Sequence, residues 1–392
     1  MVYSEDYKKL VDATALKDKY YEIDERVEEI CKEAFKGCDK LEEIVMPKKL
    51  KKIDSEAFQG CSSLTKLTLP SRVASIGRWA FCGCSGLTEL TLPDTLECIE
   101  AFAFCGCSGL TELTLPNRVR IIEVSAFEDC SGLTELTLPN RVRIIEVSAF
   151  EGCSGLEKIT VESGNSRYDS RDNCNSIIDK KTNTLIAGCK NSVIPNGVTS
   201  IGDSAFGWCS ELTELVLPNS VTSIVESAFA YCSGLEKITV ESGNSRYDSR
   251  DNCNSIIETA TNTLIAGCKN SVIPNSVTSI GDSAFEGCTG LTELTLPKSV
   301  KSIGDSAFEG CTGLTELTLP KSVTSIGGYA FAYCCGLVKI TSLAEIPPVC
   351  GFKVFNGVNK TNCELIVPEG SVAAYTRAED WNKFSNIRGF SK

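Results

Sequence analysis

Hydrophobic residues recur along this chain with a period of 23 residues. The dipeptide Ala-Phe begins at positions 34, 57, 80, 103, 126, 149, 205, 228, 284, 307 and 330. Eight of the ten intervals are 23 residues long, and the other two, of 56 residues, exceed the period by 33. A fixed period in this range is typical of solenoids, in which each repeat is one supersecondary unit. We therefore expect a stack of coils, two of which carry a 33-residue insertion.

The repeat CTGLTELTLPKSVKSIGDSAFEG, at residues 288–310, shows how one coil buries its apolar side. Leucine alternates with Glu and Thr, which predicts a short strand with the leucines inward, ended by Pro297. A Val and an Ile then predict a second buried pair on a bend or short strand, and Asp305 or Ser306 is expected to cap a short helical or 3-10 turn. The hydrophobic positions are Leu291, Leu294, Leu296, Val300, Ile303, Ala307 and Phe308.

No single coil can close a core, because its apolar edge is buried only against neighbouring coils. The expected fold is a β-rich solenoid of about 14 coils with a parallel strand ladder. We place an N-terminal cap, helical or irregular, at residues 1–26 and the solenoid at 27–343. A C-terminal coil and cap at 344–392 belong to the same domain, with a strand at ELIVP and a helix around SVAAYTRAEDWNKF. The insertions, at about 162–195 and 241–274, are each expected to form a hairpin.

One cysteine recurs in each coil. These eleven residues are Cys38, Cys61, Cys84, Cys107, Cys130, Cys153, Cys209, Cys232, Cys288, Cys311 and Cys334. Cysteine is small and apolar enough for a tight inward turn. We expect a ladder of buried structural thiols rather than a reactive or metal-binding one, because the environment repeats without a distinguishing charge.

The chain has 22 cysteines and no histidine. It therefore lacks the commonest general base and cannot form Ser–His or Cys–His dyads or histidine-ligated zinc sites. No nucleophile–base pair, phosphate loop or metal-ligand spacing is present. We predict that the protein is not an enzyme and has no catalytic, cofactor-binding or metal site.

The net charge of −12 argues against nucleic acid as a partner, because phosphate binding draws on clustered Lys and Arg. No stretch approaches the ~20 apolar residues that cross a bilayer, so no membrane insertion is expected. The charged N-terminus contains no secretory leader. The sequence fits an extracellular or cell-surface protein whose leader was removed, or otherwise a cytoplasmic one.

The pattern C-x-x-L-x-x-L-x-L-P-x-x-V-x-x-I-G-x-x-A-F resembles the repeat of the BspA-like leucine-rich repeat family over residues ~27 to 390. The resemblance implies a leucine-rich repeat solenoid and a non-enzymatic surface or secreted protein of bacterial adhesion or host interaction. Its partner would be a protein or glycan, and self-association stays open. The alternative function is an intracellular protein-interaction scaffold.

Deviations from the repeat are the candidate interface, because they place aromatic and apolar side chains on a flank that is polar in sister coils. They are Trp79, Phe102, Ile121, Val124, Ile144, Val147, Trp208, Tyr231, Tyr329 and Tyr333. Stacking should bring Trp79 against Phe102 and Trp208 against Tyr231. The alternative is that the flank is partly buried by its own turns.

Three further features have two interpretations each. The outward Glu, Lys and Thr of the strands form either a solvated ladder or an acidic docking surface. Asp and Asn in the YDSRDNCN segments serve turn chemistry or hold calcium, and the neighbouring Arg167, Arg171 and Tyr168 suggest a local salt-bridged knot. Cys82 with Cys105, and Cys350 with Cys363, are spaced for disulfides in an oxidising compartment or stay free thiols.

Overall fold

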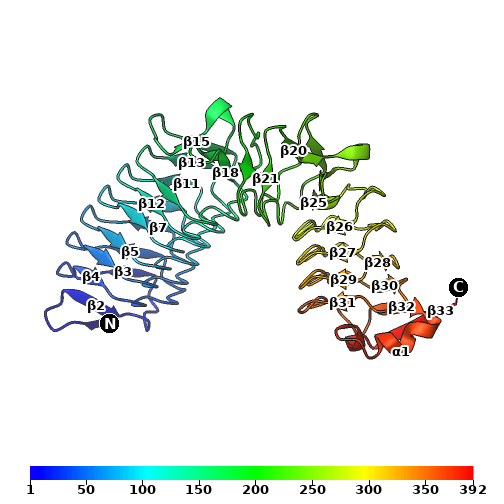
Figure 1. Ribbon diagram of the computed structural model, residues 1–392. Helices are drawn as coiled ribbons and strands as arrows, with labels where there is room; N and C mark the ends of the chain where they lie inside the picture. The colour runs from blue at the N-terminus through cyan, green and yellow to red at the C-terminus, as the bar shows by residue number, and fades with distance from the viewer. Residues whose placement is uncertain (392) are drawn as a thin grey trace. The chain divides into compact units, whose positions relative to one another are not determined.

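The computed structural model describes residues 1–391, which form two compact units of stacked coils (Figure 1). The N-terminal unit contains residues 1–195 and 202–205, and the C-terminal unit contains residues 196–201 and 206–391. In both units each coil contributes a strand to one or two parallel ladders. The leucine-rich repeat solenoid expected from the period is therefore the fold.

The first ladder is made of the leucine strands. In the N-terminal unit they are β3 (Tyr20–Glu22), β5 (Glu43–Val45), β7 (Lys66–Thr68), β9 (Glu89–Thr91), β11 (Glu112–Thr114), β13 (Glu135–Leu138) and β15 (Lys158–Val161). In the C-terminal unit they are β20 (Glu214–Leu217), β22 (Lys237–Val240), β28 (Glu316–Leu319), β30 (Lys339–Ser342), β32 (Glu364–Pro368) and β33 (Asn386–Phe390). The register is in phase with the repeat: Leu136 lies beside Ile159, and Glu135 beside Lys158.

The second ladder holds the Ile of the Val and Ile pair in most coils. In the N-terminal unit it comprises β1 (Val2–Tyr3), β2 (Lys9–Asp12), β4 (Glu29–Ile30), β6 (Lys52–Ile53), β8 (Ser75–Ile76), β10 (Cys98–Ile99), β12 (Ile121–Ile122) and β14 (Ile144–Ile145). In the C-terminal unit it comprises β19 (Ser200–Ile201), β21 (Ser223–Ile224), β26 (Ser279–Ile280), β27 (Ser302–Ile303), β29 (Ser325–Ile326) and β31 (Val349–Cys350).

The turn that carries Ala-Phe is not helical, which corrects the expected helical or 3-10 turn and its cap at Asp305 or Ser306. The residue before Ala-Phe is left-handed, with φ of +59° at Glu56 and +50° at Ser306. Its amide points to the next coil, so that the N–H of Ser306 donates to the carbonyl of Gly328 at 2.8 Å. The chain therefore gains hydrogen bonds between coils here instead of within a helix.

The core of each unit is a column of stacked phenylalanine rings. Phe35, Phe58, Phe81, Phe104, Phe127 and Phe150 stack with centroids 4.8–5.7 Å apart. Beside this column the eleven ladder cysteines are buried. Several donate their Sγ–H to a phenylalanine carbonyl of the preceding coil, as Cys107 does to Phe81 at 3.3 Å. Each coil thus supplies the cover of the one before it, which is why near-identical sequences stack.

Residues 1–26 are neither helical nor irregular, which corrects that expectation. Strand β2 pairs in parallel with β4, and β3 with β5, while β1 closes the edge by antiparallel pairing to β2. Leu10, Ala13 and Ile23 are buried in the same core as the repeats. The division of the chain into a cap, a solenoid and a C-terminal coil stays a prediction.

The coils number about 17 rather than 14. The difference arises from the N-terminal strands and the insertions, whose strands also stack. As expected, each insertion forms a hairpin, β17 (Ile177–Asp179) with β18 (Thr184–Ala187) and β24 (Ser255–Glu258) with β25 (Thr263–Gly267). Each hairpin is preceded by a short strand and a 3-10 turn, namely β16 (Tyr168–Asp169) with η1 (Arg171–Asn173), and β23 (Tyr247–Asp248) with η2 (Arg250–Asn252).

The C-terminal end is closed by an aromatic cluster. The expected strand is β32, and the expected helix is shorter than predicted, consisting of η3 (Glu369–Ser371), α1 (Val372–Tyr375) and η4 (Trp381–Lys383). Trp381 is fully buried, and its ring centroid lies 5.1 Å from that of Phe355, the last ring of the column. This segment covers the end of the core, as solenoid ends require.

Candidate functional site

The candidate interface residues divide into exposed and half-buried side chains. Ile144, Val147, Trp208 and Tyr333 are 43%, 46%, 43% and 52% exposed. The half-buried ones are Trp79, Phe102, Ile121, Val124, Tyr231 and Tyr329. Six of the ten residues are thus half-buried, in keeping with partial burial of the flank by its own turns, and four are exposed.

The expected aromatic neighbours stack. The ring centroids of Trp79 and Phe102 are 5.1 Å apart, and those of Trp208 and Tyr231 are 3.7 Å apart with an interplanar angle of 4°. Tyr329 instead contacts Phe352 edge-on at 5.5 Å. Stacking follows from the coil spacing, because equivalent positions of successive coils lie one strand spacing apart.

Trp208, Tyr231 and Tyr333, which we name the aromatic flank, stand where other coils place glycine. Their φ angles are +61°, +58° and +55°, and the equivalent Gly37, Gly60 and Gly310 have φ of +71°, +74° and +70°. A left-handed backbone costs about 1–2 kcal/mol for a residue with a side chain. Bulky residues held in this conformation are outliers that point to a functional constraint.

The aromatic flank is continuous along the C-terminal unit. The ring of Tyr231 lies over Gly287 and Gly310, where a Cβ atom would meet it at 2.3 and 3.4 Å. Burial, together with the charge of Glu286, raises the pKa of Tyr231 to about 12. Tyr231 therefore stays neutral near pH 7 and packs against the neighbouring coils, while Trp208 and Tyr333 present their rings to solvent.

An aliphatic patch lies on the second ladder of the N-terminal unit. Ile121 pairs with Ile144 in the register of β12 and β14. Val124 and Val147 lie on the adjoining turns, where the amide of Ser125 donates to the carbonyl of Val147. The exposed members, Ile144 and Val147, belong to the coil that precedes the first insertion. The insertion therefore leaves apolar side chains uncovered beside it.

The strand face of the N-terminal unit is hollowed by a shallow groove of about 860 Å³. Its charged lining is acidic, comprising Asp94, Glu112, Glu135 and Glu162. Glu135 is paired with Lys158 at 3.2 Å, and Glu89, on the adjoining coil, with Lys66 at 2.6 Å. These pairs are exposed and add little to stability. The ion pairs favour the solvated ladder, whereas the groove leaves the acidic docking surface open.

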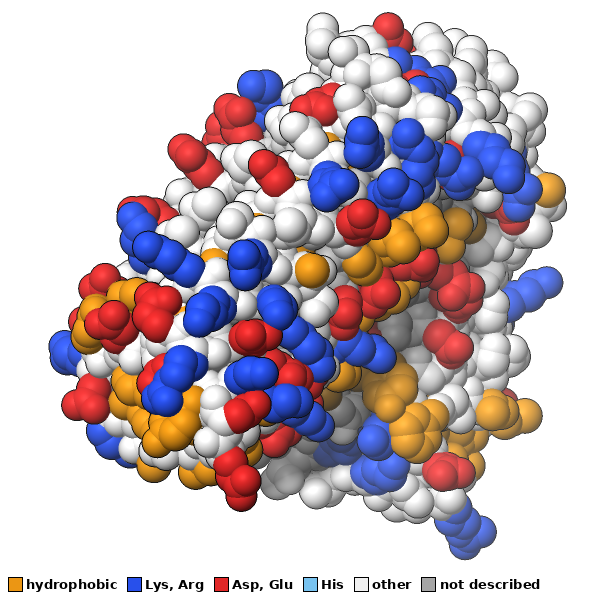
Figure 2. All heavy atoms as spheres, turned by 90° about the vertical axis from the view of Figure 1, so that its left-hand side faces the viewer, with side chains coloured by type: hydrophobic (Ala, Val, Ile, Leu, Met, Phe, Trp, Pro, Cys, Tyr) orange, Lys and Arg blue, Asp and Glu red, His pale blue; other side chains and the backbone are white. Residues whose placement is uncertain are grey.

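The N-terminal coils carry charges of both signs. Figure 2 shows Lys, Arg, Asp and Glu side chains interspersed over this side, with separate small hydrophobic patches between them. Lys9 and Lys52 both pair with Glu29, at 2.8 and 3.2 Å. A mixed surface of this kind gives no single-sign field for steering a charged partner.

Sequence reasoning missed an apolar group near the C-terminal end. Ile346, Val349 and Phe352 are 82%, 73% and 64% exposed, and Lys353 places its ammonium 4.8 Å from the Phe352 ring. Val349 occupies the ladder position of Ser325, with which it pairs. A Val at a ladder position that holds Ser in sister coils could have revealed this group, but Val349 lies beyond the last Ala-Phe coil.

The cysteine ladder is chemically quiet. Burial raises the pKa of Cys130, Cys288 and Cys334 to about 12, and that of Cys107 well above its usual range. All 22 cysteines are free thiols in this structure, Cys350 and Cys363 included. Thiolates are the reactive form, so Cys107, Cys130, Cys288 and Cys334 are inert near neutral pH.

Cys82 differs from the ladder. Its thiol lies beside that of Cys105 on the next coil, and a hydrogen bond from Cys105, aided by Gln59, lowers the pKa of Cys82 to about 7 against the effect of burial. The same bond raises the pKa of Cys105. The two residues are half-buried free thiols rather than a disulfide. The pair therefore holds one thiolate near neutral pH.

We expect Cys82 to be alkylated by iodoacetamide with a rate that rises through about pH 7, while the ladder cysteines do not react. Cys105→Ala should move that midpoint upward because the donor is lost, whereas Cys105→Ser should largely preserve it. Mass spectrometry of peptides after timed labelling measures both. Equal rates for Cys82 in the wild type and Cys105→Ala would refute the assigned hydrogen bond.

The insertions contain ion pairs between their basic and acidic side chains. Arg167 pairs with Asp179 at 2.6 Å and Arg171 with Asp169 at 2.9 Å, and Tyr168 accepts the Ile145 amide on its hydroxyl at 3.0 Å. This is the knot expected from the sequence. Within residues 1–391 no group of three or more Cys, Asp or Glu has the arrangement of a metal site. No helix in that part of the chain is long and apolar enough to cross a bilayer.

In a comparison with protein families, residues 15–91, 51–178, 177–266 and 263–359 match the model of the BspA-type leucine-rich repeat region. Comparison with curated proteins gives no match.

Solved structures of bacterial repeat proteins are similar to this fold. A leucine-rich cell surface protein from Faecalibacterium prausnitzii is 28% identical, with a TM-score of 0.54, over 83% of this chain and 88% of that one. A leucine-rich repeat protein from Bacteroides ovatus is 25% identical, with a TM-score of 0.40, over 95% and 83% of the two chains. Another from Eubacterium ventriosum is 21% identical, with a TM-score of 0.49, over 72% and 73%.

Proposed function

The chain belongs to the BspA-type leucine-rich repeat family, and on that basis we propose that it is a non-enzymatic protein-binding protein of the bacterial cell surface that recognises its ligand through the aromatic flank. The family is generally non-enzymatic. The cell-surface location is supported by the similarity to the Faecalibacterium prausnitzii cell surface protein. A role in adhesion or host interaction follows from that location.

The observation that carries the proposal is the left-handed backbone of Trp208, Tyr231 and Tyr333. Glycine at these positions would satisfy the fold without strain, as it does in sister coils. Trp and Tyr are the residues that dominate binding energy in protein interfaces. The exposed ring of Trp208 stacks on the half-buried Tyr231, and the exposed ring of Tyr333 extends the same flank, which gives a surface of that type.

The test is the double substitution Trp208→Gly/Tyr333→Gly. Each glycine removes about 1–2 kcal/mol of backbone strain and gives up about 0.5–1.5 kcal/mol of ring stacking or packing. The double variant should therefore lose no more than about 1 kcal/mol of stability. We expect captured ligand to fall at least tenfold when the tagged double variant replaces wild type on beads incubated with solubilised bacterial-surface and host extracellular proteins.

The matched control is Tyr7→Gly, which removes a left-handed and exposed aromatic residue from the turn between β1 and β2. It should leave capture unchanged. Light scattering of both variants shows whether the captured protein is a second copy of the chain. Undiminished capture by the Trp208→Gly/Tyr333→Gly protein would overturn the proposed role of the aromatic flank.

A further inference from the structure

The second insertion interrupts the contact between two coils of the C-terminal unit. In regular coils the amide of each phenylalanine donates to the alanine carbonyl of the next coil, as Phe206 does to Ala228 at 2.9 Å. At the insertion, Gly267 of β25 takes this role and donates to Ala284 at 2.8 Å. A Cβ on Gly267 would lie 2.1 Å from the Phe285 ring, which explains the glycine. Strand β25 therefore lies between the coil of Phe229 and that of Phe285.

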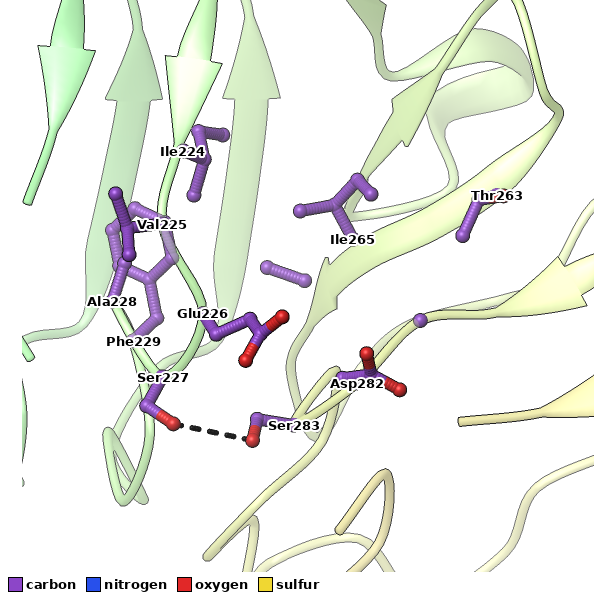
Figure 3. Close-up of a pocket in the computed structure, with 12 residues that line it drawn as sticks. Ile224, Val225, Glu226, Ser227, Ala228, Phe229, Thr263, Ile265, Asp282 and Ser283 are labelled. Carbon is purple, nitrogen blue, oxygen red and sulfur yellow. Dashed lines mark hydrogen bonds between the residues drawn. The ribbon is translucent and has the colours of Figure 1, made fainter. Parts of the chain in front are cut away.

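The same two coils touch again a few residues further on. The amide of Tyr231 donates to the Glu286 carbonyl at 2.9 Å, and the hydroxyls of Ser227 and Ser283 are hydrogen-bonded at 3.2 Å. Two coils that are separated at one end and joined at the other leave a wedge-shaped gap. It forms a pocket of about 220 Å³ (Figure 3). Phe229, which lacks a stacking partner on this side, is only partly buried.

The lining of this pocket combines apolar walls with two carboxylates. Ile224, Val225 and Ile265 supply aliphatic surface. Figure 3 places Glu226 and Asp282 on opposite sides of the gap, one from each coil. Glu226 and Asp282 form no ion pair with any Lys or Arg of the described chain, although Asp282 accepts the Asp305 amide at 2.7 Å. Both carboxylates are exposed, one on each coil, so a cation in the gap lies near a negative charge on each side.

We propose that this pocket binds the side chain of a lysine or arginine presented by a partner protein. The stem of such a residue is aliphatic and its head is cationic, so the apolar walls and the paired carboxylates are each complementary to one part of it. The pocket is smaller than the ~300–1,000 Å³ of small-molecule sites, which suits one side chain. The identity of the partner as a protein rests on the proposed function.

The first insertion supplies a natural comparison within the N-terminal unit. There the counterpart of Glu226 is Val147, and that of Ala230 is Glu151. Burial raises the pKa of Glu151, which hydrogen-bonds Ser148 and Ser204, the counterparts of the two pocket serines. The acidic pair is thus specific to the second insertion, and Val at position 226 is compatible with the fold.

The probes are the peptides Ac-GGKGG-NH2 and Ac-GGRGG-NH2, with a norleucine peptide that keeps the stem and lacks the charge. Each is titrated up to about 10 mM, where a single-side-chain contact is measurable. We expect the methyl NMR signals of Ile224, Val225 and Ile265 to shift with both basic peptides. Their Kd should be at least fivefold lower than that of the norleucine peptide. Absence of shifts, or equal Kd for the norleucine peptide, overturns the proposal.

Two variants localise the effect. Glu226→Gln/Asp282→Asn should abolish the preference for the basic peptides, and Glu226→Val should weaken it at least twofold. The control Glu293→Gln removes a negative charge on the strand face and should change nothing. Trp208→Gly/Tyr333→Gly should not alter peptide binding, so failure of the pocket and failure of the aromatic flank give different results. A retained preference in Glu226→Gln/Asp282→Asn contradicts the assignment.

Discussion

Replacing Phe104 by alanine is expected to lower the free energy of unfolding by about 3–5 kcal/mol. The ring is fully buried and lies between those of Phe81 and Phe127, with centroids 5.4 and 5.5 Å away. Its removal leaves a cavity that identical coils above and below cannot fill. Urea unfolding followed by the fluorescence of Trp79, the one tryptophan of the N-terminal unit, measures the loss.

The control for Phe104→Ala is Phe229→Ala. Phe229 is partly exposed and stacks on Phe206 alone, at 5.6 Å, because β25 separates it from Phe285. Its replacement should cost less, about 1–3 kcal/mol, since fewer contacts are lost. Equal losses at the two sites, measured in the same urea series, would show that the stacked column is not the principal source of stability.

Replacing Trp381 by alanine is expected to be as damaging, at about 3–5 kcal/mol, because it opens the end of the C-terminal unit. The indole packs on Phe355 and Tyr375 and donates its Nε1–H to the Pro348 carbonyl at 2.9 Å. Loss of a cap exposes core and strand edges, so the variant should also aggregate. Urea unfolding and size-exclusion chromatography measure the two effects.

Trp381→Phe separates the two contributions of the indole. It retains most of the buried ring and leaves the Pro348 carbonyl without its donor, which costs about 1–3 kcal/mol. The variant should remain monodisperse. Aggregation of Trp381→Phe to the extent of Trp381→Ala would mean that the hydrogen bond, rather than burial of Phe355, closes the unit.

The repeat period was sufficient to predict the solenoid, the inward leucines and both hairpins, because each depends on local alternation and on identical neighbours. It failed at the N-terminus, where Leu10 and Ile23 fill core positions without the repeat's letters. It also failed at the Ala-Phe turn. Ser306 has the residue type of a helix cap, but a hydrogen bond to the next coil, invisible in one repeat, sets its conformation.

The candidate sites were predictable only in part. Substitutions against the repeat identified Trp208 and Tyr333, but not that their backbone is left-handed. Comparing them with the glycine of sister coils at the same place would have revealed it. The pocket at Glu226 could not be predicted from the sequence, because it exists only where β25 lies between two coils. That arrangement depends on contacts across about 40 residues.

The most direct test of the central claim is the dissociation constant of the captured ligand for Trp208→Gly/Tyr333→Gly, measured beside the variant's free energy of unfolding. If the aromatic flank is retained for binding, the constant rises at least tenfold, which is about 1.4 kcal/mol or more, while the unfolding free energy falls by no more than about 1 kcal/mol. An unchanged dissociation constant with a large loss of stability would show that these aromatic residues serve the fold, and would contradict the claim.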